Sequence, residues 1–141
     1  MKIERISTVD REFMQQINLL FDDKKWDEVE GKKFLENDDN ALFVAIEDKT
    51  PVGFLTAHRL QRFDSRKAEV LLYEIGVHED HRRKGIGKAL IEAVKQWAKE
   101  VGADEVWVLT EKDNIPAMKM YQSAGGVEES PGTIMFVYKT E

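Results

Sequence analysis

The stretch Tyr73-Glu-Ile-Gly-Val-His-Glu-Asp-His-Arg-Arg-Lys-Gly-Ile-Gly-Lys-Ala-Leu-Ile91 contains the end of an apolar strand, a basic loop with two glycines and the start of an amphipathic helix. The first turn of a helix carries unpaired backbone N–H groups and a partial positive charge. Gly85 and Gly87 lack a Cβ, so a ligand can approach the backbone closely there. The order of strand, loop and helix therefore predicts an anion site suited to a di- or polyphosphate, and the same loop supplies further positive charge from Arg82, Arg83, Lys84 and Lys88.

Two other phosphate-binding loops fit this stretch less well. The G-x-x-x-x-G-K-[ST] spacing of a Walker loop is missing. A dinucleotide fingerprint, G-x-G-x-x-G, needs a third glycine where Leu90 stands. Because glycines and lysines are common in loops, Gly85 and Gly87 alone leave an ordinary strand–turn–helix connection with a solvated basic loop as an equal alternative.

The segment Arg82-Arg-Lys-Gly85-Ile-Gly87 resembles the R/Q-x-x-G-x-G/A pattern of the GNAT superfamily of N-acetyltransferases. A second motif of that family recurs downstream, in Asn114-Ile-Pro-Ala117-Met-Lys-Met-Tyr121-Gln-Ser-Ala-Gly125. The resemblance covers essentially the whole chain. It implies an α/β (α+β) fold, with a mixed central sheet, splayed central strands and helices packed on the sheet. It also implies acetyl-CoA as the co-substrate, with its pyrophosphate held by the loop.

The composition excludes several classes of function. The chain has 141 residues, and 21 basic against 27 acidic side chains give a net charge of −6, which argues against nucleic acid as a partner and suits a cationic substrate. It has no cysteine, so disulfides, thiolate metal sites and a cysteine nucleophile are excluded. No apolar run approaches the roughly 20 residues of a membrane span, and the N-terminus lacks a signal-peptide h-region. We expect one cytoplasmic domain over residues 1–141, without a metal or a membrane partner.

Hydrophobic periodicity predicts the order β-α-α-β-β-β-α-β-α-β, a mixed sheet with helices packed on it. Val70 to Val77 shows little polar alternation, which is typical of a central strand covered on both faces. One apolar stripe at helical spacing contains Ile86, Leu90, Val94 and Trp97. The helix that carries it should end at Gly102. The remaining predicted elements are strands over 2–6, 41–47, 52–60, 67–77, 105–110 and 133–138, and helices over 13–21, 29–36 and 116–124.

Acetyl transfer from a thioester to an amine requires an unprotonated amine, donors for the oxyanion and a proton for the leaving thiolate. Glu74 is the lone carboxylate in the apolar run and is the candidate general base, or else an anchor for the substrate ammonium. The alternatives are a structural pair with Arg59 or Lys67, or an edge residue facing water. Tyr121 matches the family's tyrosine and is the candidate acid. A core tyrosine whose hydroxyl is tied to a neighbour is its alternative.

The resemblance also assigns the residues that hold the co-substrate. It implies that backbone groups of Ile75, Gly76 and Val77 contact the pantetheine arm. The Val77 N–H would donate a hydrogen bond to the oxyanion, and Gly76 permits a bulge in the strand. Asn114 matches a position that often hydrogen-bonds the arm, although asparagine before a helix is also a plain N-cap. The pyrophosphate loop and the second motif complete the set, with Arg82, Arg83, Lys84, Gly85, Ile86, Gly87, Lys88 and Ala117.

Ala57 to Gly85 further resembles the type I aminoglycoside 3-N-acetyltransferases, through a narrower pattern carried by Leu60, Phe63, Lys67, Glu69, Val70, Leu72, Tyr73, Glu74 and Ile75. The chain departs from this pattern with Glu74 and Asn114, where aspartate is expected. The resemblance implies a polycationic small-molecule acceptor, attacked directly in a ternary complex. Acidic residues should then gather around the cleft, and the candidates are Asp22, Asp23, Asp27, Glu28, Asp64, Glu111 and Asp113.

Other functions remain open at this point. The chain could acetylate a protein lysine, a protein N-terminus or a polyamine, or it could be a catalytically silent acyl-CoA-binding module. His58, His78 and His81 show no metal-ligand spacing. The sequence does not decide between a monomer and a homodimer, in which the C-terminal strand is an element that two copies can exchange.

Overall fold

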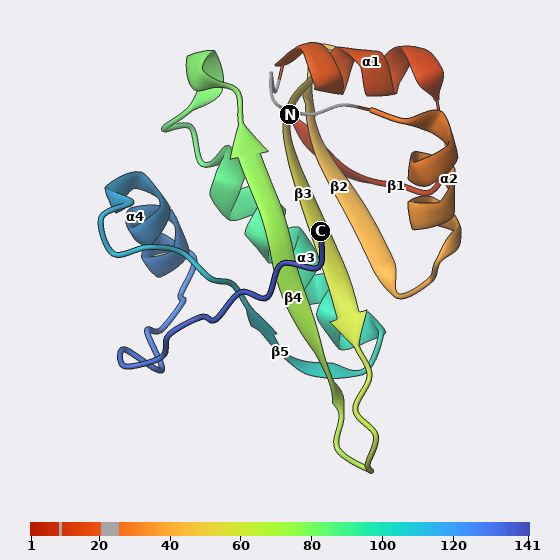
Figure 1. Cartoon of the computed structure of the whole chain (residues 1–141). Coiled ribbons are helices and arrows are strands. Elements are labelled where there is room, and N and C mark those ends of the chain that lie inside the picture. The colour runs from red at the N-terminus through yellow and green to blue at the C-terminus, as the bar shows by residue number, and fades with distance from the viewer. Residues whose placement is uncertain (9, 21–25) are drawn as a thin grey trace.

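The structure, a computed structural model, describes residues 1–8, 10–20 and 26–141. Within these residues five strands form one sheet in the order β1-β2-β3-β4-β5 (Figure 1). Neighbours from β1 to β4 are antiparallel, and β5 runs parallel to β4, so the predicted mixed sheet is confirmed. The strands are β1 (Lys2–Ile6), β2 (Asn40–Glu47), β3 (Thr50–Leu60), β4 (Ala68–Val77) and β5 (Ala103–Trp107).

Four α-helices accompany the sheet in the described part of the chain: α1 (Arg11–Leu20), α2 (Glu28–Glu36), α3 (Ile86–Glu100) and α4 (Ile115–Ser123). A short 3₁₀ turn, η1 (Glu79–His81), precedes the basic loop. In Figure 1 α3 lies behind the sheet, and α1 and α2 lie on the side of β1 and β2. The predicted end of the first helix at Phe21 lies outside the described residues.

The core forms between α3 and one face of the sheet. Leu90 and Val94 of α3 are fully buried and pack with Leu55 of β3 and Val70 of β4. These residues recur with a period of two in the strands and at helical spacing in α3, which confirms the predicted apolar stripe. After α3 the chain turns at Gly102 with φ of +77°, the left-handed conformation expected of a helix-ending glycine.

Strand β4 is covered on one face only, so the prediction of two covered faces is wrong. Val70 and Leu72 are buried against α3, whereas the Tyr73 side chain is 62% exposed. The predicted bulge also lies elsewhere. Thr56 pairs with Glu74 and Ala57 with Leu72, so the extra residue is Tyr73 and not Gly76. A bulge bends its strand and increases its twist.

Strand β5 separates from β4 just before this bulge. The last parallel pair joins Leu71 and Trp107, and residues 108–110, predicted as the end of the strand, leave the sheet. The two strands therefore diverge from Tyr73 onward. This divergence agrees with the splayed central strands expected of the fold and opens a space between the end of β4 and α4.

The last predicted strand, residues 133–138, is not formed in this chain. A strand needs a partner whose backbone groups complete its hydrogen bonds, and the described residues supply none there. The segment runs in Figure 1 as an extended trace to the C-terminus. Its apolar side chains are between 61% and 86% exposed, and they are Ile134, Met135, Phe136, Val137 and Tyr138.

Candidate active site

A cavity of about 690 Å³ lies where β4 and β5 diverge. Residues 73–77 of β4 line it, together with residues 108–110 after β5 and one side of α4. Leu19 of α1, Phe54 of β3 and the start of the basic loop complete the lining. No sequence pattern identified Leu19, Phe54 or residues 108–110 as cavity residues, because the divergence of the strands comes from tertiary structure.

Glu74 is half-buried in β4 and lines this cavity. The two cations considered as structural partners lie elsewhere. The Nε of Arg59 donates to the Val101 carbonyl oxygen at 2.9 Å, and its guanidinium pairs with Asp39. Lys67 precedes the first residue of β4, at the opposite end of the strand. Glu74 is thus a lining residue of the cavity, and its role as base or as anchor for the ammonium stays a prediction.

Tyr121 lines the same cavity from α4 and is half-buried. Burial raises the pKa of the Tyr121 phenol above its usual value of 10.0, because the charged phenolate loses solvation. Its hydroxyl makes no hydrogen bond within the described part of the chain, so the alternative of a core tyrosine tied to a neighbour is not what the structure shows. A phenol that keeps its proton near neutral pH is available as a proton donor.

The basic loop turns sharply into α3. Arg83 has φ of +66° and Gly85 has φ of +80°, and Gly85 occupies the N-cap position of α3 without a side-chain hydrogen bond to the helix. The first N–H groups of α3 are therefore not capped by a side chain. Arg83, Lys84 and Lys88 are exposed around this helix end. Arg82 lines the cavity, and its Nε donates to the carbonyl oxygen of Val77 at 3.1 Å.

Two residues of the loop motif point into the protein. The Ile86 side chain is 2% exposed and belongs to the core, so only its backbone can face a phosphate. Gly87 does not leave room for a ligand as expected, because Met120 fills the space beside it. A Cβ on Gly87 would collide with the side chain of Met120 in α4. The small size of Gly87 therefore allows α3 and α4 to approach each other.

The second motif builds the α4 wall of the cavity. Asn114 is the N-cap of α4, and its Oδ1 accepts a hydrogen bond from the Ala117 N–H at 3.2 Å. Pro116 lies in the first turn, where a missing N–H costs nothing. Asn114 and Ala117 both line the cavity. The capping role is thus visible in the structure, and the contact with pantetheine stays a prediction.

The described members of the proposed acidic cluster do not line this cavity. Asp27 caps α2, Glu28 pairs with Arg11, and Asp64 pairs with Arg66. None of the five described candidates, these three with Glu111 and Asp113, lines the cavity. Asp22 and Asp23 lie outside the described residues.

Among the described residues, the carboxylates that line the cavity are Glu74 and Glu79, and the lining cation is Arg82. The described part of the charged lining is therefore slightly acidic. The five described candidates are therefore not lining residues, and the prediction of an acidic cluster around the cleft stays open for Asp22 and Asp23.

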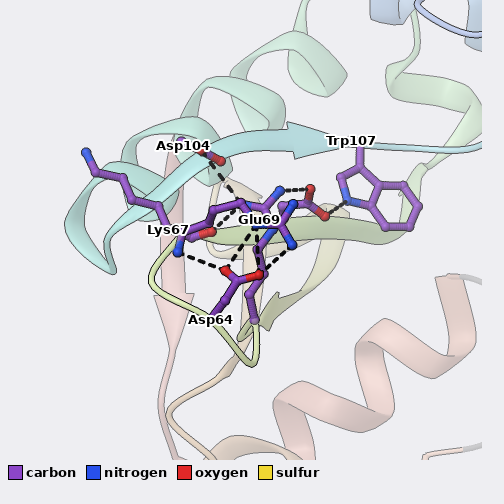
Figure 2. A network of polar contacts seen from close by, with 7 residues as sticks. Asp64, Lys67, Glu69, Asp104 and Trp107 are labelled. Carbon is purple, nitrogen blue, oxygen red and sulfur yellow. Dashed lines mark hydrogen bonds and ion pairs between the residues drawn. The ribbon is translucent and has the colours of Figure 1, made fainter.

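A polar network at the opposite end of β4 holds the β3–β4 loop (Figure 2). The guanidinium of Arg62 pairs with Glu69 and, at 3.8 Å, with Asp104, and the indole Nε1 of Trp107 donates to Glu69 at 3.2 Å. A hydrogen bond to Glu105 lowers the pKa of Glu69, and the same contact raises the pKa of Glu105. Part of the narrower sequence pattern, which includes Glu69, thus ties the hairpin to β5.

The histidines lie outside any metal cluster. His58 contacts Asn40 at 2.8 Å, His81 contacts Glu47 at 2.9 Å, and the ring of His78 accepts from the Asp80 N–H. Among the residues that the structure describes, no three His, Asp or Glu side chains gather as metal ligands would. No helix in the described ranges is long and apolar enough to span a bilayer.

Comparison with known proteins assigns the family. The family model of the acetyltransferase (GNAT) family matches residues 7–126. Human N-acetyltransferase 8 is 33% identical over 94 residues, which are 67% of this chain and 41% of that protein. The chain therefore spans less than half the length of that relative.

Two aminoglycoside acetyltransferases are similar over more of their length. Aminoglycoside N(6')-acetyltransferase type 1 of Salmonella typhimurium is 30% identical over 110 residues, covering 76% of this chain and 75% of that enzyme. The crystal structure of meta-AAC0020, from an uncultured soil metagenomic sample, in complex with sisomicin is 30% identical, with a TM-score of 0.88 over 99% of this chain and 96% of the other. The first enzyme is named for the 6' amine, whereas the narrower sequence resemblance pointed to 3-N enzymes. The match of the family model over most of the chain shows that this protein belongs to the acetyltransferase (GNAT) family.

Proposed function

We propose that the protein transfers an acetyl group from acetyl-CoA to a primary amine of a cationic small molecule. The observation that carries this proposal is the meeting of Glu74 and Tyr121 in one cavity, from two elements distant in sequence. Arg82, from the basic loop before α3, lines the same cavity. A carboxylate, a protonated phenol and an anion site are the three parts that such a transfer needs.

The residues present fit acetyl-CoA. Its phosphates suit the uncapped N-terminus of α3 and the cations Arg82, Arg83, Lys84 and Lys88, since backbone N–H groups and positive charge converge there. The edge of β4 from Ile75 to Val77 faces the cavity and would hold the pantetheine arm through backbone groups. Bound there, acetyl-CoA supplies an acetyl group activated as a thioester.

Side chains of the protein then accept and donate the protons that the reaction transfers. Glu74 accepts a proton from the ammonium of the acceptor, so that the neutral amine nitrogen can bond to the acetyl carbon as the carbon–sulfur bond breaks. Tyr121 gives its proton to the departing sulfur and regains one from the nitrogen, which loses its second proton as the amide forms. The Val77 N–H stabilises negative charge on the carbonyl oxygen. No covalent bond to the protein forms, which agrees with the absence of cysteine.

An aminoglycoside is the acceptor that we propose to test first. Similar enzymes include one named as an aminoglycoside N(6')-acetyltransferase and one crystallised with sisomicin. In the described part of the lining there are two carboxylates and one arginine, a balance that favours a polycation. Acetylation of the 6' amine, and not of the 3 amine, is the regiochemistry that the name of the Salmonella enzyme favours.

The test is CoA release from acetyl-CoA with sisomicin as the acceptor, followed by NMR of the product. A saturable rate and a single acetylated amine support the proposal, and the product spectrum identifies the 6' or 3 position. Turnover of spermidine or of a peptide, but not of sisomicin, would show that the acceptor is a polyamine or a peptide and not an aminoglycoside. Tight acetyl-CoA binding without turnover of any of the three would favour a silent acyl-CoA-binding module.

A homodimer is a further proposal about partners. Residues 133–138 have the pattern of a strand, are exposed and pair with no strand among the described residues. Strand β5 is the last strand of the described sheet, so one of its edges is open. A second copy offers both a partner for the segment and cover for its apolar side chains.

A further inference from the structure

Thr56 of β3 has a hydroxyl that the fold buries without using. Its Oγ1 is inaccessible to solvent and has no hydrogen-bond partner among the described residues. Such a group is costly, because it loses its bonds to water and gains none. Buried hydroxyls without partners are rare in native proteins, so each one calls for an explanation.

Thr56 lies directly opposite Glu74 in the antiparallel pair of β3 and β4. Side chains of opposed residues stand on the same face of a sheet, with Cβ atoms about 4.5–5.5 Å apart. Ala57 and Leu72, the next opposed pair, are buried against α3. Since side chains alternate along a strand, Thr56 and Glu74 share the face that points away from α3.

The bulge at Tyr73 creates this pairing. If the register of Ala57 with Leu72 continued without an extra residue, Thr56 would oppose Tyr73, and Glu74 would oppose Leu55, which is buried in the core. A shift of one residue moves side chains to the other face. The extra residue therefore turns Glu74 out of the core and places it beside the hydroxyl of Thr56.

The same face leads to the cavity. Phe54, two residues before Thr56 on this face, lines the cavity together with Glu74. A hydroxyl can donate one hydrogen bond and can rotate to suit its acceptor. The unused donor of Thr56 is thus a cross-strand neighbour of the carboxylate that we assign as the base.

We propose that Thr56 is a positioning residue for acetyl transfer. Its hydroxyl donates a hydrogen bond to one oxygen of the Glu74 carboxylate when an acceptor occupies the cavity, so that the other oxygen is held toward the amine. Bonds to a charged acceptor are among the stronger hydrogen bonds in proteins. This inference rests on the proposed function of Glu74 as the base.

A purely structural threonine makes a different prediction for stability. Thr56→Val keeps the shape and the β-branched side chain, and it replaces the hydroxyl with a methyl group. If the hydroxyl serves the fold through a hydrogen bond, the variant melts at lower temperature. If the hydroxyl serves Glu74 during turnover, the variant melts at the same or a higher temperature and is slower.

The experiment measures kcat with sisomicin, the affinity for acetyl-CoA and the melting temperature of the wild-type chain, Thr56→Val and Thr56→Ser. The exposed Thr50→Val, at the start of the same strand, is the matched control. We expect kcat of Thr56→Val to fall about tenfold, with acetyl-CoA affinity and stability retained, and Thr56→Ser to recover most of the rate.

Three results would overturn the role of Thr56: an unchanged kcat in Thr56→Val, equal losses in the valine and serine variants, or a lower melting temperature of the valine variant. A wild-type chain that acetylates none of the three acceptors would instead refute the proposed function itself. That measurement precedes the variants, so the two failures are told apart.

Discussion

Met120 of α4 occupies the space that a Cβ on Gly87 of α3 would need. Gly87→Ala must therefore displace the flexible Met120 side chain, at a cost toward the low end of the roughly 1–3 kcal/mol of overpacking. Gly87 lies in the first turn of α3, so its gain in helix propensity is smaller than the roughly 1 kcal/mol of a helix interior and does not offset this cost. We expect the variant to lower the free energy of unfolding in denaturant titrations.

The control for this pair is the Met120→Ala background. With Met120 shortened, Gly87→Ala should stabilise the chain by less than about 1 kcal/mol through helix propensity. A double-mutant cycle measures this change of sign. Additive effects would mean that the two side chains do not compete for one space.

Gly85→Glu should abolish measurable acetyl-CoA binding in calorimetry. The substitution places a carboxylate at the phosphate end of α3 and strains a backbone with φ of +80°. Gly102→Glu is the matched control, because Gly102 has φ of +77° and equally open surroundings at the other end of α3. Equal losses of affinity in both variants would trace the effect to backbone strain and not to the phosphate site.

Tyr121→Phe should reduce kcat by roughly 10²-fold and leave acetyl-CoA affinity intact. Tyr138→Phe, in the exposed C-terminal segment, is the control. Burial raises the pKa of Tyr121 above 10.0, so the protonated donor persists below that value and is lost only as the pH rises through the raised pKa. The wild-type rate should therefore show no fall from this group near neutral pH, and an unchanged kcat in the variant would remove Tyr121 from the mechanism.

The pair of Glu69 and Glu105 should respond to substitution in opposite directions. Glu105→Gln removes a negative charge that is unfavourable beside the Glu69 carboxylate. The substitution should therefore raise the melting temperature at pH 7. Glu69→Gln loses the ion pair with Arg62 and should lower the melting temperature. Because the network lies at the far end of β4 from the cavity, kcat should change little in either variant.

The pH dependence of this pair follows from the two pKa shifts. The raised pKa of Glu105 destabilises the folded state only above the usual glutamate pKa of 4.5, so the gain in Glu105→Gln should vanish as the pH falls below 4.5. The lowered pKa of Glu69 stabilises the fold above 4.5, and that stability is lost as the pH falls through the folded-state pKa. Melts across acid pH would contradict this account if the Glu105→Gln gain persisted there.

Removal of residues 133–141 should convert a dimer into a monomer in light scattering. The reason is the loss of the exposed apolar segment that includes Phe136 and Val137. Phe136→Asp tests the same contact without shortening the chain. A monomeric wild-type protein at high concentration would refute the exchange.

The sequence determined much of this protein through local rules. The stripe that includes Leu90 and Val94 set the buried face of α3, and Gly102 marked its end, because periodicity and backbone conformation act over a few residues. Asn114 with Pro116 marked the start of α4. The loop motif and the second motif identified the family, although nothing local shows where their side chains meet.

Tertiary structure decided the rest. The extra residue at Tyr73 is a property of strand pairing, and it alone turns Glu74 toward Thr56 and away from the core. Met120 gave Gly87 a packing role that its motif did not reveal. Residues 133–138 have the composition of a strand and form none in this chain, because a strand exists only with a partner backbone, and the availability of that partner is not written in the segment itself.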